Sequence, residues 1–216
     1  ESDGTLARGK FLSAFLENVG VSTKMSRTTN YSSDDLNLST IAAQSNSYGG
    51  YFISLHSNGA NNSANYVISE YCGTRSSDST EKVSGSKKFA YTAAVQHDKN
   101  RLTDVTYSTP RAINDYAFNG WNLGVLRTNS QGGYLVESWF HDYRPETLRM
   151  KGDAYNRYLA WQLARAYMEY PKGNASGIKG CVVGDIRNTS KGCGYSKYTH
   201  RNRDSYLAVN GAKVEL

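Results

Sequence analysis

The sequence has no hydrophobic run long enough to cross a membrane. A membrane-spanning helix needs about 20 consecutive apolar residues, and no stretch of the 216 residues approaches that length. The first residues also lack the basic and apolar stretches of a signal peptide, and the chain does not begin with Met. We therefore expect a mature secreted form or a fragment, without a transmembrane segment.

Cysteine is scarce as well. The chain contains three, Cys72, Cys181 and Cys193, and no Cys-x-x-Cys spacing. This argues against a zinc site built from thiolates. Cys181 and Cys193 could pair in an oxidising compartment, which would leave Cys72 over, so the count neither proves nor excludes secretion.

Charge of one sign is not concentrated in any segment. The net charge is +6, yet the 19 acidic residues are interspersed among the 25 basic ones. The densest basic stretch, residues 197–203, is explained by a solvated face. We therefore predict no nucleic-acid partner, while a net positive charge is compatible with attraction to an anionic polymer such as a cell wall.

Helical and strand-like patterns alternate along most of the chain. Apolar residues recur at helical spacing over residues 6–16, 36–42, 83–96 and 150–170. Short apolar runs predict strands over 51–55, 123–126 and 134–136, and the segments 21–25 and 66–71 are further strand candidates. Asp34 or Asp35 is expected to cap the second helix. This alternation predicts an α/β fold in which a mostly parallel mixed sheet is flanked by helices on both faces.

The pattern changes after residue 171. Residues 172–177 have the composition of a linker, and strands are predicted over 178–186 and 207–216 with a tight turn at Asn210-Gly211. Only about 40 residues follow the linker, which is marginal for an independent core. We therefore expect one α/β domain over residues 1–171, a linker over 172–177 and the start of a β-rich module over 178–216.

Chemically capable side chains follow two of the predicted strands. His56 comes directly after an apolar run that begins at Tyr51, and Glu137 follows the run 134–136. Ligands of an open α/β sheet bind beyond the carboxyl ends of its strands, and imidazole and carboxylate both bind metals. On spacing alone, each residue could equally be an ordinary turn residue.

Three segments carry a more specific pattern. Residues 1–7 read ESDGTLA and lead through a helix to Gly20-Val21 and then to Ser26-Arg27. Residues 52–58 read FISLHSN, and residues 134–140 read YLVESWF after the run 124–127. In order and separation, these segments resemble the zinc-dependent N-acetylmuramoyl-L-alanine amidases of the Amidase_3 family, over roughly residues 1–170.

The resemblance implies hydrolysis of the amide between the lactyl group of N-acetylmuramic acid and the L-alanine of the stem peptide. It implies that Glu1 and His56 bind Zn²⁺ and that Glu137 is the general base. The family's first zinc ligand is a His in a Gly-rich strand-end motif upstream of the Glu, so this His and the first strand are expected to be missing from the printed residues. Peptidoglycan is then the expected partner, and the cell envelope, the periplasm or the exterior the expected location.

Three further residues are candidates for contacting the substrate. Asn58 belongs to the motif at residues 52–58, and His141 comes four residues after Glu137. Arg127 could orient an anionic or carbonyl group of the substrate, or could pair with a carboxylate of the fold. His141 could equally be an ordinary surface residue.

The C-terminal piece, through residues 180–185 and 210–216, resembles the start of a β-sandwich module of the carboxypeptidase-regulatory or immunoglobulin-like type. Two alternatives to an amidase stay open at this point. The first is a non-catalytic peptidoglycan-binding domain that has lost its metal site, which the missing His favours. The second is a zinc peptidase that cleaves another bond of the same polymer.

Overall fold

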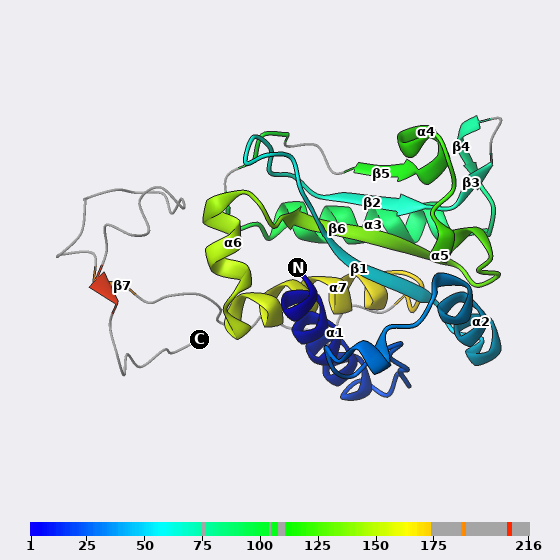
Figure 1. The fold of residues 1–216 in the computed structure, drawn as a ribbon, viewed down its shortest axis with the longest axis horizontal. Coiled ribbons are helices and arrows are strands. Elements are labelled where there is room, and N and C mark those ends of the chain that lie inside the picture. The colour runs from blue at the N-terminus through cyan, green and yellow to red at the C-terminus, as the bar shows by residue number, and fades with distance from the viewer. Residues whose placement is uncertain (75–76, 104, 108–110, 174–186, 189–206, 209–216) are drawn as a thin grey trace.

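The structure of the chain is a computed structural model that describes residues 1–74, 77–103, 105–107, 111–173, 187–188 and 207–208. The helices, including one 3-10 turn (η1), are α1 (Ser2–Glu17), η1 (Ser32–Asp34), α2 (Leu38–Tyr48), α3 (Ser86–Lys99), α4 (Asp115–Asn119), α5 (Gly124–Arg127), α6 (Arg144–Met150) and α7 (Asp153–Glu169). The strands are β1 (Phe52–Asn58), β2 (Ile68–Tyr71), β3 (Gly73–Thr74), β4 (Ser77–Glu81), β5 (Arg111–Asn114), β6 (Gly133–Phe140), β7 (Arg187–Asn188) and β8 (Leu207–Ala208). Figure 1 shows the helices packed around a central sheet.

The central sheet has four strands in the order β1-β6-β2-β5. β1 runs parallel to β6 and β2 runs parallel to β5, while β2 and β6 are antiparallel. The predicted mixed, mostly parallel sheet is thus confirmed. Its register aligns one row of residues across all four strands, in the order His56, Glu137, Ile68 and Arg111.

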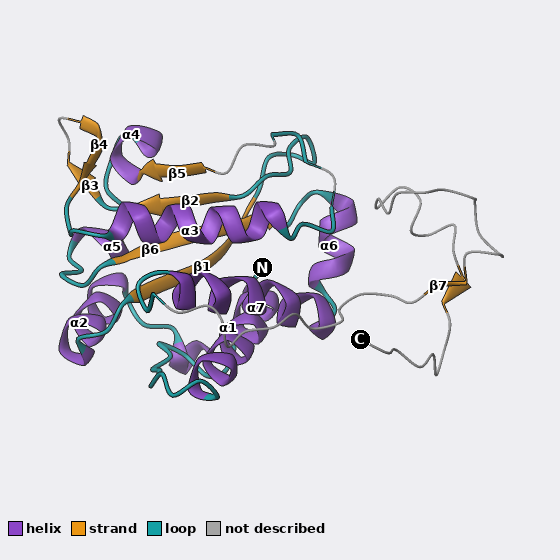
Figure 2. Ribbon diagram, turned by 180° about the vertical axis from the view of Figure 1, so that it is seen from behind, coloured by secondary structure: helices purple, strands orange, loops and turns teal. Residues whose placement is uncertain are grey.

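Both faces of the sheet are covered, as the sequence predicts. On one face, here called the α3 face, α3 packs on β6, α1 packs on β1, and α7 packs against α1 and α3. The core on this face contains Phe89, Tyr134, Val136 and Leu159. Figure 2 shows α3 and α7 lying along this side of the strands. The other face, here called the α5 face, carries a smaller cluster around Leu135, with α5 and α2 above it. Side chains alternate between the faces along each strand, so Tyr134 and Leu135 belong to different layers.

The structure corrects two of the predicted strands. Residues 123–126 form the start of helix α5, in which the N–H of Arg127 donates to the carbonyl of Leu123 at 2.8 Å. An apolar run this short fits a buried helical turn as well as a strand, and packing against Leu135 decides for the helix. Residues 21–25 belong to no helix and pair with no strand among the described residues.

The second helix also begins later than its apolar spacing suggests. Asn37, rather than Asp34 or Asp35, caps α2, because its side chain accepts from the backbone N–H of Thr40 at 2.8 Å. Asp34 instead accepts from the N–H and the hydroxyl of Thr29 and so closes the preceding loop. Both arrangements satisfy backbone donors that lack partners within the helix or turn.

Most of the expected C-terminal module lies outside the described residues, including the linker beyond residue 173 and the cysteines Cys181 and Cys193. Within it, β7 and β8 pair as a short antiparallel ladder. Cys72 is buried and is a free thiol. None of the described helices combines the length and the hydrophobicity needed to cross a membrane.

Candidate active site

Strand pairing places His56 beside Glu137. The two residues are register partners on the parallel strands β1 and β6, so their side chains project from the same face of the sheet. The apolar residues that precede each of them hold the strands in the core. β1 continues two residues past His56 to Asn58, with a register irregularity at this point. The sheet therefore presents an imidazole and a carboxylate side by side near one end.

Helix α1 brings Glu1 to the same point. Glu1 is the residue before the helix, and its Oε1 lies 3.2 Å from Nδ1 of His56 and accepts from the N–H of Ser57 at 3.1 Å. Burial raises the pKa of Glu1, but the hydrogen bonds from His56 and Ser57 outweigh burial and lower this pKa to about 2. Burial lowers the pKa of His56, but the hydrogen bond to Glu1 and the charge of Glu137 leave it raised. The pair is therefore held as a carboxylate in contact with an imidazole.

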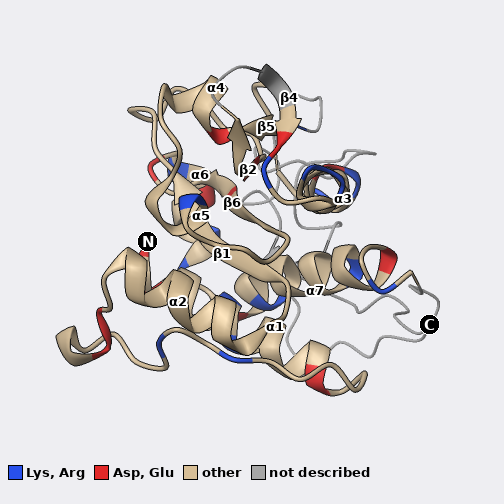
Figure 3. Cartoon of the chain, turned by 90° about the vertical axis from the view of Figure 1, so that its right-hand side faces the viewer, with Lys and Arg blue, Asp and Glu red and all other residues tan. Residues whose placement is uncertain are grey.

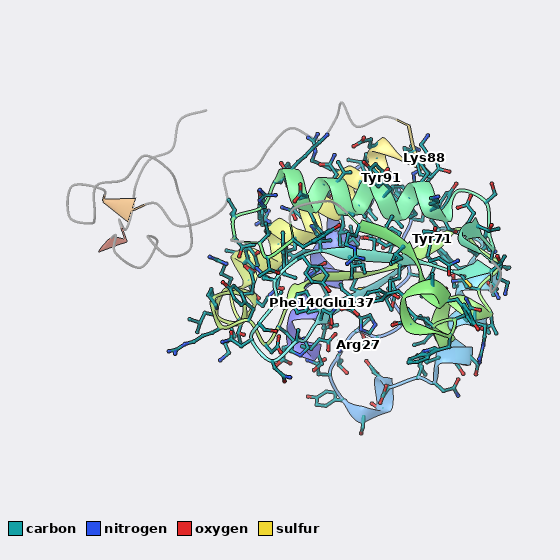
Figure 4. The ribbon with its side chains drawn as sticks, turned by 90° about the horizontal axis from the view of Figure 1, so that it is seen from above. Arg27, Tyr71, Lys88, Tyr91, Glu137 and Phe140 are labelled. Carbon is teal, nitrogen blue, oxygen red and sulfur yellow. The ribbon has the colours of Figure 1, made fainter. Side chains whose placement is uncertain are left out.

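The carboxyl of Glu137 has a buried oxygen atom, Oε2, that lacks a hydrogen-bond partner among the described residues. Burial raises the pKa of Glu137, and the charges of His56 and His141 oppose this rise only in part. Figure 4 shows Glu137 near Phe140, the residue that ends β6. A buried polar atom without a partner costs free energy, which is typical of a group that binds a ligand or water.

His141 approaches the site from the turn after β6. Its Nδ1 lies 2.6 Å from the carbonyl oxygen of Ser57, and because a carbonyl only accepts, Nδ1 carries the proton. Its charge contributes to lowering the pKa of both Glu1 and Glu137, which places the ring near these carboxyls. Nε2 makes no hydrogen bond to the part of the chain that is described. This nitrogen is available to a ligand.

The structure does not bring the other two candidates to the same contact. Asn58 ends β1, and its side-chain oxygen accepts from the N–H of Gly59 at 2.8 Å, which shapes the turn. Arg127 is exposed at the end of α5, and its carbonyl accepts from Lys82. Figure 1 shows α5 well away from the N-terminus that carries the site.

Sequence reasoning missed a buried guanidinium under the site. Arg8 is fully buried on α1, and its side chain donates to the carbonyl of His56 at 3.1 Å and to the hydroxyl of Ser57 at 3.4 Å. Burial lowers the pKa of Arg8 to about 10. The available signal was its spacing, since Arg8 precedes Leu12 and Leu16 by one and two helical turns on the buried stripe of α1.

A second arginine holds the start of α1. Nη2 of Arg27 donates to the carbonyl of Ser2 at 2.8 Å and to the hydroxyl of Thr5 at 3.0 Å. These bonds tie the first turn, and with it Glu1, to the loop after residue 25. Figure 4 shows Arg27 on the side of the sheet that Glu137 faces.

A third carboxyl, Glu70 on β2, lies on the same face of the sheet as Glu137. Its register partner is Leu135, two residues before Glu137. Glu70 is 3% exposed, and its Oε2 accepts from the amide of Asn119 at 2.6 Å. Burial raises its pKa to about 7 despite this bond, and the charge of Glu137 adds to the rise. Nothing in the local sequence of β2 indicates this burial, which depends on the neighbouring strand and on α4.

A large groove opens beside Glu1 and His56. It has a volume of about 830 Å³ and is lined by α1, the loop over residues 21–36, α2 and the outer edge of β1. β1 is an edge strand of the described sheet, so its backbone groups on this side have no strand partner there. Figure 3 shows Lys and Arg spread over several elements in this view rather than gathered on one face.

The donor atoms at this point fit part of a zinc site. Zinc binds imidazole nitrogen and carboxylate oxygen, and His56 and Glu1 supply one of each in direct contact. The orphaned oxygen of Glu137 adds a hydrogen-bond acceptor next to them. The described residues contain no cluster of three or more His, Cys, Asp or Glu side chains that could hold a metal ion. Glu1 and His56 thus offer two donor atoms of the kinds that zinc binds, and a complete site would need further donors.

Comparison with known proteins gives a consistent result. The model of a protein family, Amidase_3, described as N-acetylmuramoyl-L-alanine amidase, matches residues 1–168. AmiC2 of Nostoc punctiforme is similar in structure at 20% identity and a TM-score of 0.63, over 80% of this chain and 84% of that one. Ami1 of Mycobacterium smegmatis aligns at 19% identity and a TM-score of 0.66, over 81% of this chain and 78% of that one. An N-acetylmuramoyl-L-alanine amidase of Clostridium difficile 630 aligns at 22% identity and a TM-score of 0.63, over 80% and 84%. No curated protein sequence matches the chain.

Proposed function

Because the chain belongs to the Amidase_3 family and is thus an N-acetylmuramoyl-L-alanine amidase, a hydrolase of peptidoglycan, we propose that Glu137 is its general base and that Glu1 and His56 bind a zinc ion. The observation that carries this proposal is the contact of 3.2 Å between Glu1 and His56, with Glu137 as the register partner of His56. The bond cleaved is the amide between the lactyl carbonyl of N-acetylmuramic acid and the nitrogen of L-alanine.

The reaction adds water across this amide. Zinc, when bound, supplies polarisation of the scissile carbonyl and lowers the pKa of a water toward ~7. Glu137 takes a proton from the attacking water and delivers it to the alanine nitrogen as the carbon–nitrogen bond breaks. The carbonyl carbon keeps the water oxygen as a carboxylate, and the stem peptide leaves with a free amino terminus.

Arg8 positions the groups that take part. Its two hydrogen bonds hold the backbone of His56 and the side chain of Ser57, and Ser57 in turn donates its N–H to Glu1. The positive charge of Arg8 also attracts the carboxylates of Glu1 and Glu137. This attraction offsets part of the free-energy cost of burying two negative charges close together. Arg8 thus acts on the reaction through His56 and Glu1.

His141 is the candidate that the geometry favours for contacting the substrate. Its Nδ1–H donates to the carbonyl of Ser57, which fixes the ring and leaves Nε2 to contact the substrate. The substrate roles of Asn58 and Arg127 stay predictions. Because the substrate class lies outside the cytoplasmic membrane, we place the enzyme in the cell envelope, the periplasm or the exterior.

Two variants separate zinc binding from proton transfer. His56→Ala is expected to lose zinc in elemental analysis, because an imidazole ligand is removed. Glu137→Gln is expected to keep zinc and to lose about 10²–10⁴-fold in kcat, the range for one general base. Glu169→Gln on α7 is the matched control and should retain both zinc and activity.

Product analysis by mass distinguishes the alternatives. An amidase releases peptides that begin with L-alanine, whereas a peptidase would cut within the stem. Activity that survives a chelator would refute the zinc proposal, and full activity in Glu137→Gln would refute the role of the base. Binding to peptidoglycan without any product would instead identify a non-catalytic domain.

A further inference from the structure

Arg111 stands in the same cross-sheet row as the catalytic residues. It begins β5 and is the register partner of Ile68, which is itself the partner of Glu137 on β6. Direct partners in a ladder project from the same face of a sheet. The guanidinium of Arg111 and the carboxyl of Glu137 therefore arise from one face, two strands apart, at the end of the sheet where β1 and β6 finish.

Three aromatic rings surround this guanidinium. Its Cζ lies 5.0 Å from the ring centre of Tyr107, 5.9 Å from that of Phe118 and 6.0 Å from that of Tyr66. Tyr107 and Phe118 are 46% and 39% exposed, so the rings form an open rim. The ring centre of Tyr66 also lies 4.7 Å from that of Phe140, which connects this rim to the end of β6.

No described carboxylate neutralises Arg111. It makes no ion pair or hydrogen bond within the described part of the chain, and its recorded contacts are the three rings. Glu70, two residues along β2 from Ile68, is instead held by Asn119. Stacking on rings leaves the planar donors of a guanidinium free, and a carboxylate is their natural bidentate ligand.

We propose that Arg111 binds a carboxylate of the stem peptide, on the second residue beyond the scissile amide, and so selects the peptide. This inference rests on the proposed amidase function. Two strand spacings of about 4.8 Å place Arg111 roughly 10 Å from Glu137. Two extended residues span about 7 Å, and a carboxyl adds the remaining reach. The lactyl carboxyl of muramic acid forms part of the scissile amide and is not free to bind Arg111. A free carboxylate of the substrate therefore belongs to the stem peptide.

The test uses two muramoyl tripeptides that differ only at the carboxyl of the second residue, which is free in one and a carboxamide in the other. The unmodified enzyme should favour the free acid. Arg111→Gln should raise KM for the free acid about tenfold or more, with kcat nearly unchanged, because a remote contact binds ground and transition states alike. KM for the amide should change little, and Arg111→Lys should restore part of the preference.

Arg157→Gln is the matched control. Arg157 is exposed and, like Arg111, lies over a ring, Phe15, at 5.7 Å, but it belongs to α7 on the α3 face. It should leave both KM values unchanged. Equal effects of Arg111→Gln on the two substrates, or no preference in the unmodified enzyme, would overturn the inference.

A binding measurement separates this inference from the proposed function. Calorimetry with the free tripeptides, as acid and as amide, compares the unmodified protein with Arg111→Gln in the absence of any cleavage. Weaker binding of the acid alone supports the site even if the protein cleaves neither muramoyl peptide. Identical affinities in both proteins would refute the site even if the amidase activity is present.

Discussion

Glu70 is expected to make the folded protein less stable as the pH rises. The carboxyl is 3% exposed, and burial raises its pKa to about 7 from an ordinary 4.5. In the unfolded chain it ionises near 4.5, so between these values the folded state binds a proton that the unfolded state has released. The free energy of unfolding therefore falls as the pH rises through this window, by about 3 kcal/mol in all at ~1.4 kcal/mol per pKa unit.

Glu70→Gln tests this reasoning because Gln is neutral at every pH and its oxygen still accepts from Asn119. Urea unfolding of both proteins at pH 4.5, 6 and 8 gives the difference in free energy of unfolding at each pH. We expect a small difference at pH 4.5 and a variant that is more stable by about 2–3 kcal/mol at pH 8. His56 and Glu137 are present in both proteins, so the effects of their own titration largely cancel in the difference. A difference that does not change with pH would refute the buried, neutral carboxyl.

Two further substitutions probe the packing that supports the site. Arg8→Met should lower the free energy of unfolding by about 2–4 kcal/mol in urea, because the carbonyl of His56 loses its charged donor in a buried position, and a change below about 0.5 kcal/mol would contradict the role of Arg8. Gly73→Ala should destabilise by about 1–3 kcal/mol, because a Cβ there would overlap the side chain of Asn114, whereas Gly152→Ala meets only an ordinary contact at 3.4 Å and serves as the control. Equal Tm values for these two glycine variants would show that Asn114 can move aside.

Long and strongly periodic segments could be assigned from the sequence. Helices α1, α3 and α7 and strands β1 and β6 follow from apolar spacing, since burial of one face or of a whole run leaves a local signature. Segments 21–25 and 123–126 were misassigned because a segment of only four or five residues suits a strand, a helical turn or an irregular loop. Which of these conformations forms depends on the hydrogen bonds and packing contacts that the segment makes with residues elsewhere in the chain.

The sequence by itself determined the family, through the motifs around Glu1, His56 and Glu137, and the alternation that makes an α/β fold. Tertiary structure decided which side chains share the site. Arg8, Glu70 and Arg111 acquire their positions from helix packing and from strand register. Strand register places residues that are dozens of positions apart in the sequence side by side. Hydrophobic periodicity shows only which local structure a segment forms and which of its faces is buried.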